Sequence, residues 1–226
     1  MVVKVLEHTD PAEVRDALWA GFKPVSVGFD VGANCGQSVP DLLRFCSKVV
    51  SLEPSGDSYA ELVRRYTKEP RVTCRRFAVS DHDGKVELAC LPGRPAETGQ
   101  LVTPGLKGME WDPGDWDDPS ITRDSFTAKT MDWLAGQFGM PGFVKVDTEG
   151  HEEQVLRGAT RVLGARRTDW LIEFHSPGGH GVCLEILTLA GCRTETIRHP
   201  HYTPGGHFWR QHGWIKAHAP TDEGTP

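Results

Sequence analysis

The sequence predicts one α/β domain built on a mostly parallel β-sheet. Apolar segments of strand length alternate along the chain with segments of helical periodicity, which is typical of such domains. The chain has 226 residues, a length that suits one large domain with its own buried core. Its residues are 38% hydrophobic and 25% charged, the balance of a water-soluble globular protein.

Composition excludes several classes of function. The formal charge of -6 argues against a dedicated nucleic-acid binder, whose affinity depends on cationic side chains that neutralise phosphates. No apolar run approaches the roughly 20 residues that cross a bilayer, and the first residues lack the apolar core of a secretory signal. The six cysteines form no C-x-x-C pair, which indicates free thiols in a reducing compartment. We therefore expect a cytoplasmic protein that binds neither nucleic acid nor membrane.

The first 24 residues are expected to form a helical segment ahead of the sheet domain. Asp10 is placed to cap a helix whose first position is Pro11, and Gly21 marks its end. The sheet domain then extends over residues 25–218, and residues 219–226 form a flexible tail.

Within the sheet domain, short apolar segments predict the strands and longer periodic segments predict the helices. The expected strands cover residues 25–31, 49–53, 72–79, 85–90, 142–147, 170–175, 193–198 and 207–217. The expected helices cover residues 39–46, 59–66, 152–163 and 182–190. The last two strands are expected to form a hairpin.

Residues 91–124 differ in composition from the rest of the chain. They are rich in proline, and their second half is acidic, with Trp111 and Trp116 among the carboxylates. This pattern predicts a long acidic loop or lid. Such a lid could attract a cationic acceptor such as an amino sugar, although an acidic run is also a common form of solvated surface.

A glycine-containing turn follows the first strand of the sheet domain. Asp30 precedes Gly32 and Gly36 in the run DVGANCG, at the strand-to-helix turn where open α/β sheets bind nucleotide-like ligands. The run lacks the middle glycine of G-x-G-x-x-G that a dinucleotide pyrophosphate requires, and Asp30 would repel that anion. A ligand with an amino-acid part and no phosphate, such as S-adenosylmethionine, fits better. An NAD(P)-dependent oxidoreductase on a similar sheet is the alternative, and the missing glycine counts against it.

A carboxylate ends the second strand. Glu53 lies 17 residues beyond Gly36, where it can accept hydrogen bonds from both ribose hydroxyls of an adenosine. Taken alone, Glu53 is as easily explained as a solvated carboxylate at a strand end. Together with the glycine turn upstream, it favours the ligand interpretation, because the two features meet at one crevice.

Two later strands each carry a pair of polar residues. Lys145 and Asp147 share one face of a strand, and Glu173 and His175 have the same spacing at the end of the next. Charges inside apolar strands need a reason, because burying them unpaired is costly. The structural alternative is an ion pair that ties neighbouring strands or caps the following helix.

Several segments, in order along the chain, share the pattern of one family. They are Phe29–Gly36, Leu52–Pro54, Ala78–Asp81 ahead of Gly84, Thr130–Asp132, and Val144–Glu152 with Val155–Ala159. These residues resemble the FkbM family of S-adenosylmethionine-dependent methyltransferases, and the block Lys145–Ala159 is the most specific part. The resemblance implies a class I methyltransferase fold: a three-layer sandwich around a seven-stranded sheet that is mostly parallel with one antiparallel strand. It also implies O-methylation of a hydroxyl on a small natural product or sugar, with S-adenosylhomocysteine as the other product.

The resemblance also assigns cofactor-binding residues. They are Asp30, Gly32, Ala33, Asn34, Gly36, Glu53, Pro54, Ala78, Val79, Asp81 and Asp147. Of these, Asp30 to Gly36 would line the methionine part, Glu53 the ribose, and Ala78, Val79 and Asp81 the adenine edge. One position departs from the family, which often has Asn where this chain has Arg76.

Methyl transfer to an alcohol needs alignment of the acceptor and a base for its proton. Asp147 is the first candidate base, and His175 is the second because a neutral imidazole suits proton abstraction near pH 7. Lys145 would keep the Asp147 carboxylate ionised, and Glu149 is expected on the substrate side. A divalent cation held by these carboxylates is an alternative that the spacing does not favour, so no metal site is expected.

Overall fold

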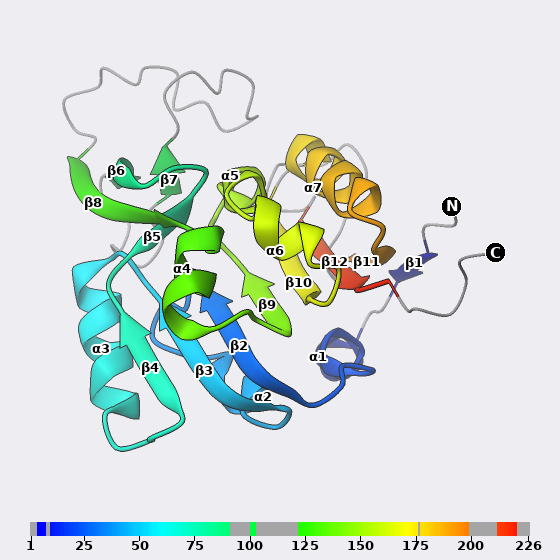
Figure 1. Ribbon diagram of the computed structural model, residues 1–226, viewed down its shortest axis with the longest axis horizontal. Helices are drawn as coiled ribbons and strands as arrows, with labels where there is room; N and C mark the ends of the chain where they lie inside the picture. Colours follow the sequence, from blue (N-terminus) through cyan, green and yellow to red (C-terminus); the bar gives the residue numbers. More distant parts are fainter. Residues whose placement is uncertain are drawn as a thin grey trace.

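The computed structural model describes residues 4–7, 10–90, 100–102, 122–175, 177–198 and 212–220. A long twisted sheet forms the middle layer, and helices pack on both of its faces (Figure 1). Within the described residues, no helix combines the length and apolarity that a bilayer crossing requires. The sheet with helices on both faces confirms the expected α/β class.

The main sheet has the strand order β1-β11-β12-β10-β9-β2-β3-β4 among the described residues. Its strands are β1 (Lys4–Glu7), β2 (Val25–Val31), β3 (Cys46–Leu52), β4 (Val72–Arg75), β9 (Phe143–Val146), β10 (Asp169–Phe174), β11 (Arg193–Arg198) and β12 (Gly213–His218). Only β12 runs antiparallel to its neighbours, β10 and β11, and β11 and β12 form the expected hairpin. Without β1, this sheet has seven strands, of which one is antiparallel, and this confirms the expected sheet. β1, which was not expected, adds an eighth strand by pairing in parallel with β11.

The helices connect and cover these strands. They are α1 (Pro11–Trp19), α2 (Val39–Leu42), α3 (Gly56–Tyr66), α4 (Met131–Phe138), α5 (Glu152–Arg157), α6 (Thr160–Gly164) and α7 (Pro177–Leu189). α1 begins as expected, because the Asp10 side chain accepts a hydrogen bond from the Ala12 N–H at 2.8 Å. The first 24 residues thus contain a helix, together with strand β1.

Alternating strand residues build a separate core on each face of the sheet. In β9, Phe143 packs with α1 and α2 residues, whereas the next residue, Val144, packs with residues of α4, α5 and α7. In β10, Leu171 and Ile172 divide between the two cores in the same way. Because both faces are covered, these strands read as continuous apolar runs, and their carboxyl ends open together at one edge.

A smaller sheet of order β5-β8-β6-β7 lies beside the main one. Its strands are β5 (Ala78–Ser80), β6 (Gly84–Cys90), β7 (Gln100–Val102) and β8 (Thr122–Thr130). The expected single strand over 72–79 was wrong: β4 belongs to the main sheet and β5 to the small one. The chain changes sheet at Phe77, whose ring packs edge-on against Trp133 with centroids 5.8 Å apart.

Part of the expected acidic loop is strand. Residues 100–102 form β7, and residues 122–124 begin β8. Residues 91–99 and 103–121 lie outside the described residues, and so do the two tryptophans of the expected lid.

Two expected helices are shorter than their apolar spacing indicated. The helix over 39–46 is only α2, and Cys46 already begins β3. Leu42 and Cys46 share one core cluster, so the spacing reflects burial against one sheet face. The helix over 152–163 divides into α5 and α6 at Gly158, where the backbone passes so close to Ser80 that a side chain would collide with its carbonyl.

Candidate active site

The predicted site residues gather where β2, β3, β9 and β10 end. These four strands are parallel, so their carboxyl ends open at the same edge of the sheet. Asp30 is the second-to-last residue of β2, Glu53 follows β3, Asp147 follows β9 and His175 follows β10. The crevice at such an edge is the usual ligand site of open α/β sheets.

The glycine turn is shaped by close packing against its neighbours. Gly32 has φ +69°, and a side chain there would collide with the carbonyl of Asp147. Gly36 has φ +86° and lies against the ring of Tyr66, whose hydroxyl donates to the Gly36 carbonyl at 2.8 Å. Both positions therefore require glycine, because a larger residue meets both strain and collision.

Glu53 is held in place by two backbone donors. Its Oε2 accepts from the Asn34 N–H and its Oε1 from the Ser55 N–H, both at 2.8 Å. Each carboxylate oxygen has a second lone pair, so both can still accept from hydroxyls of a ligand. The side chain is buried, and burial raises its pKa against the lowering effect of the two backbone donors.

Asp30 is the most buried carboxylate of the site. It has no exposed surface, and neither oxygen has a hydrogen-bond partner among the described residues. Lys145 Nζ lies 3.4 Å from Asp30 Oδ1 and 3.2 Å from Asp147 Oδ2, and donates to the Gly32 carbonyl at 3.1 Å. Burial raises the pKa of Asp30, and Lys145 opposes that rise. Burial alone would lower the pKa of Lys145, but Asp147, Asp30 and Glu173 outweigh it and hold the pKa above its usual value.

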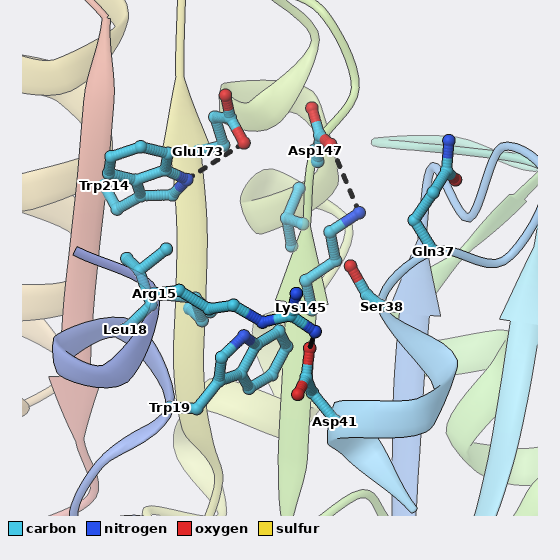
Figure 2. Close-up of a pocket in the computed structure, with 12 residues that line it drawn as sticks. Arg15, Leu18, Trp19, Gln37, Ser38, Asp41, Lys145, Asp147, Glu173 and Trp214 are labelled. Atoms are coloured by element: carbon cyan, nitrogen blue, oxygen red, sulfur yellow. Dashed lines mark hydrogen bonds and ion pairs between the residues drawn. The ribbon is translucent and has the colours of Figure 1, made fainter. Parts of the chain in front are cut away.

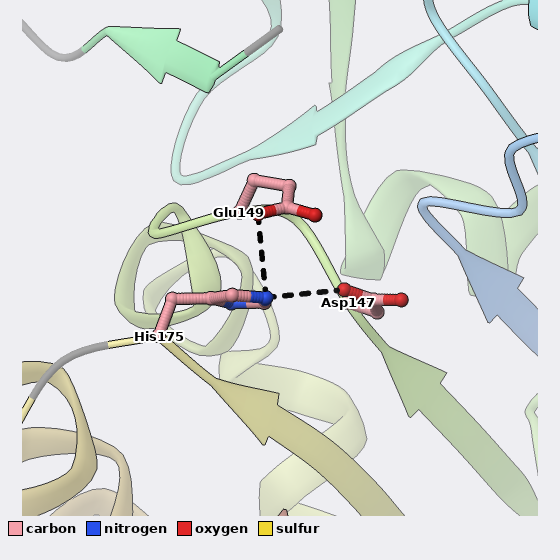
Figure 3. Close-up of side chains that lie close together, drawn as sticks. All are labelled: Asp147, Glu149 and His175. Carbon is pink, nitrogen blue, oxygen red and sulfur yellow. Dashed lines mark ion pairs between the residues drawn. The ribbon is translucent and has the colours of Figure 1, made fainter. Parts of the chain in front are cut away.

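His175 lies among carboxylates (Figure 3). Its Nε2 is 3.6 Å from Asp147 Oδ1 and 3.4 Å from Glu149 Oε2, and its Nδ1 is 3.1 Å from Glu152 Oε1. Burial would lower the pKa of His175, but these carboxylates, Glu152 first, raise it to about 10. In the absence of another cation, the centre of this cluster therefore carries an imidazolium.

Glu152 braces the loop that carries these groups. Its Oε1 also accepts from the Thr148 N–H at 3.2 Å and from the Gly150 N–H at 2.9 Å. A purely structural role is the alternative that the sequence left open for the charged residues in this region. Glu152 has such a role, because its carboxylate holds the loop from Thr148 to Gly150 ahead of helix α5.

Two residues of the site were missed. Glu173 Oε1 lies 4.0 Å from His175 Nε2, and its Oε2 accepts from the indole N–H of Trp214 at 2.9 Å. Burial and the neighbouring Asp147 raise the pKa of Glu173 to about 7. The spacing of Glu173 and His175 on one strand was the signal for Glu173. Nothing in the sequence pattern distinguished Trp214 from an ordinary core residue.

A cavity of about 240 Å³ adjoins the crevice (Figure 2). It lies between α1, the start of α2 and strands β9, β10 and β12. Its walls include Arg15, Trp19, Gln37, Ser38, Asp41, Lys145, Asp147, Leu171, Glu173 and Trp214. Asp147 and Glu173 lie at one end and Arg15 and Trp19 at the other. The cavity thus extends from the carboxyl ends of β9 and β10 to helix α1.

The residues expected at the adenine edge belong to a different element: Ala78 and Val79 lie in β5, and Asp81 follows it. Ala78 and Val79 are buried in the two adjoining cores, and Asp81 pairs with His82 at 2.6 Å. Arg76, at the departing position, donates to the Pro54 carbonyl at 3.2 Å and lies over the ring of Phe126. Arg76 is thereby tied to the loop after β3 that carries Glu53.

Comparison with known proteins agrees with this geometry. The FkbM methyltransferase domain matches residues 30–202. Hexuronic acid methyltransferase AglP of Haloferax volcanii is 29% identical over 193 residues, which cover 84% of this chain and 68% of that protein.

Solved structures share the fold. The FkbM methyltransferase of Methylobacillus flagellatus has a TM-score of 0.57 at 18% identity, over 87% of this chain and 44% of that one. Precorrin-6y C5,15-methyltransferase of Geobacter metallireducens has a TM-score of 0.50 at 12% identity, over 97% and 94% of the two chains. At such identities these likenesses show the fold alone, and this chain spans less than half of the first structure. Because the family's domain covers most of the sequence, the chain belongs to the FkbM family of S-adenosylmethionine-dependent methyltransferases.

Proposed function

We propose that this protein methylates a hydroxyl of a small acceptor, and that the acceptor is a sugar acid. The observation that carries the proposal is the convergence of the glycine turn, Glu53 and Asp147 on one crevice beside a cavity. The family supports methyl transfer, and the hexuronic acid substrate named for the relative AglP supports the acceptor class.

The residues of the crevice fit S-adenosylmethionine. The buried carboxylate of Asp30, which has Lys145 as an ion-pair partner but accepts no hydrogen bond among the described residues, and the side-chain oxygen of Asn34, which also accepts none, are suited to a cationic amino-acid part. Glu53 can accept hydrogen bonds from two ribose hydroxyls, because each of its oxygens has a lone pair beyond the one used by a backbone donor. We propose that Ala78, Val79 and Asp81 lie beside the adenine ring of the cofactor. When bound, the cofactor supplies a methyl group on a sulfonium that leaves as a thioether.

The chain's own residues position the acceptor and accept its proton. The acceptor oxygen must approach the methyl carbon in line with the breaking carbon–sulfur bond, and alignment alone can supply much of the acceleration. Asp147 borders both the crevice and the cavity, so its carboxylate takes the hydroxyl proton as the carbon–oxygen bond forms. Lys145, 3.2 Å from Asp147 Oδ2, holds that carboxylate in place. The protonated His175 is less suited to act as the base.

The cavity suits a sugar-sized acceptor. Its volume of about 240 Å³ lies below the usual range for larger ligands. Trp19 and Trp214 provide flat apolar walls, and Arg15 provides a guanidinium for an acceptor carboxylate. An amino sugar is the second candidate, and the acidic composition of residues 109–124 favours it.

An acceptor screen tests the proposal. The protein is incubated with S-adenosylmethionine and, in turn, glucuronic acid, galacturonic acid, glucose and glucosamine, and products are followed by mass spectrometry. We expect one methyl group to be added to a uronic acid and to survive mild alkali, as an ether does and a methyl ester does not. Transfer to glucosamine alone would favour the amino sugar. If calorimetry detects no binding of S-adenosylhomocysteine to the folded protein, methyl transfer itself is refuted.

A further inference from the structure

We propose that Asp147, Glu149 and His175 form a site for a divalent cation of the Mg²⁺ or Mn²⁺ class. Oδ1 of Asp147, Oε2 of Glu149 and Nε2 of His175 face one another (Figure 3), and a set of their ligand atoms lies within 4.8 Å of one another. The part that the cation plays with the acceptor rests on the proposed function, whereas its binding does not.

The separations fit ligands that flank an ion better than they fit hydrogen bonds. His175 Nε2 is 3.6 Å from the Asp147 oxygen and 3.4 Å from the Glu149 oxygen. A nitrogen–oxygen hydrogen bond is about 2.7–3.2 Å long, so both distances are too great. Ligands that each lie about 2.1 Å from one ion, at right or tetrahedral angles, are about 3.0–3.4 Å apart. A small inward adjustment therefore completes the coordination.

The imidazole is oriented for metal binding by its other nitrogen. His175 is 8% exposed, and its Nδ1 faces the fully enclosed carboxylate of Glu152 at 3.1 Å. When His175 is neutral, as a metal ligand must be, that contact favours the Nδ1–H tautomer and leaves the Nε2 lone pair directed at Asp147 and Glu149. Within the described part of the chain, Nε2 makes no hydrogen bond. A histidine whose second nitrogen donates to a carboxylate is the common arrangement around protein-bound metals.

The surrounding charge also calls for a cation. Besides the two carboxylate ligands, Asp30, Glu152 and Glu173 lie in the same neighbourhood. Among the described residues, two basic side chains face these five carboxylates, Lys145 and His175 itself. The Nζ of Lys145 pairs with Oδ2 of Asp147, which leaves Oδ1 to face His175. Carboxylates in such excess are costly to bury without further positive charge.

The position gives the cation a role. Three protein ligands leave open coordination positions, and Asp147 also lines the acceptor cavity. A hydroxyl that coordinates a divalent cation has a lowered pKa and a fixed orientation. A ligand set of two carboxylates and one imidazole suits Mn²⁺. The two carboxylates are also ligands that Mg²⁺ accepts. The cation would thus orient the acceptor hydroxyl beside the Asp147 carboxylate.

Direct titration with Mn²⁺ tests the site. Free Mn²⁺ is followed by electron paramagnetic resonance as metal-free protein is added, without any methyl donor or acceptor. We expect one saturable site in the wild type, and an affinity at least tenfold lower in Glu149→Gln, whose side chain is 45% exposed and can be changed without disturbing the core.

The matched control is Glu153→Gln. Glu153 pairs with Arg157, at an N–O distance of 2.7 Å, and is not one of the three proposed ligands. His175→Ala removes a second ligand, and circular dichroism establishes whether it is folded.

The outcomes separate this site from the proposed function. Saturable binding that Glu149→Gln weakens and Glu153→Gln does not supports the site. Equal binding by the wild type and Glu149→Gln, or no saturable binding, overturns it. S-adenosylhomocysteine binding is measured on the same samples. If the protein binds S-adenosylhomocysteine but no Mn²⁺, the metal site is refuted and the proposed function is not. A protein that binds Mn²⁺ and no S-adenosylhomocysteine keeps the site and loses the proposed function.

Discussion

The backbone N–H of Asn34 donates to Glu53 Oε2 at 2.8 Å, so the glycine turn and the end of β3 form one unit. Asn34 has φ +49°, a conformation that is uncommon for a residue other than glycine. The Ser55 N–H holds the other oxygen at the same distance. The protein's own hydrogen bonds thus hold the two halves of the proposed cofactor site together, an arrangement that reduces the ordering cost of binding.

Glu53→Gln tests the ribose interaction. The variant keeps the shape of the side chain but places an amide N–H₂ where a carboxylate oxygen accepted hydrogen bonds. Losing charge-assisted hydrogen bonds to the hydroxyls should weaken S-adenosylhomocysteine about 10- to 100-fold. Isothermal titration calorimetry measures the affinity. Glu69→Gln is the control, because Glu69 is an exposed partner of Arg71 remote from the crevice. Equal losses in the two variants would refute the assignment.

The same carboxyl gives binding a pH dependence of known sign. Burial raises the pKa of Glu53, so it takes up a proton at a higher pH than an exposed glutamate does. Affinity for S-adenosylhomocysteine should therefore fall as the pH drops from neutral toward mildly acidic values. The stability of the ligand-free domain responds in the opposite direction at this residue, because a raised folded-state pKa favours folding when the group is protonated. Calorimetry across pH should give a flatter profile for Glu53→Gln, and identical profiles would contradict the assignment.

The sequence predicted most of the main sheet because its central strands, such as β9 and β10, are buried on both faces. Phe143 to Val146, for example, is an apolar run apart from Lys145, and its position was correct to within two residues. The polar residues at the strand ends were identifiable for the same reason, since parallel strands bring their carboxyl ends to one edge.

Other features depend on contacts that no local pattern records. The change of sheet at Phe77 depends on Trp133, and the break between α5 and α6 depends on Ser80, which lies far away in sequence. The convergence of Glu149 on His175 depends on a positive φ of +53° at Glu149. A non-glycine residue in that conformation is uncommon, so the residue spacing did not favour the metal site that the structure leads us to propose.

Gly32→Ala should destabilise the domain. A β-carbon at this position would meet the Asp147 carbonyl, and the φ of +69° is unfavourable for alanine. We expect a loss of about 2 kcal/mol or more in the free energy of unfolding, and weaker binding of S-adenosylhomocysteine. Urea denaturation measures the first quantity.

Gly164→Ala is the matched control for that change. Gly164 ends helix α6, and a β-carbon there meets nothing within 4 Å. Alanine should therefore be neutral or stabilise the domain by about 0.5–1 kcal/mol. A Gly32→Ala protein as stable as Gly164→Ala would show that the turn is not packed as described.

Cofactor binding should protect one thiol from alkylation. Cys35 lies inside the glycine turn and is half-buried, as is Cys74 on β4. We expect S-adenosylhomocysteine to slow iodoacetamide modification of Cys35 and to leave Cys74 unchanged, as read by peptide mass spectrometry. Cys46 is a slow-reacting reference, because burial raises its pKa to about 12. Protection of Cys35 and Cys74 to the same extent would indicate global tightening of the fold.

Two arginines share one carboxylate, and only one of them lines the acceptor cavity. Arg15 lies 2.8 Å from Asp41 Oδ2 and Arg44 lies 3.7 Å from Asp41 Oδ1, but the cavity is lined by Arg15. If Arg15 binds the carboxylate of a uronic acid, Arg15→Gln should raise the KM for that acceptor. Because its side chain is 64% exposed, we expect a rise of about three- to tenfold rather than the larger effect of a buried pair.

Arg44→Gln provides the comparison, since it removes the same charge from the same carboxylate outside the cavity. The KM for a uronic acid should stay at the wild-type value in Arg44→Gln, and kcat should change little in either variant. With a neutral sugar as acceptor, Arg15→Gln should have the same KM as the wild type, because that acceptor has no carboxylate for Arg15 to bind. Steady-state kinetics with both acceptors measures these effects. Equal KM values for Arg15→Gln and Arg44→Gln would place the acceptor's carboxylate elsewhere in the cavity.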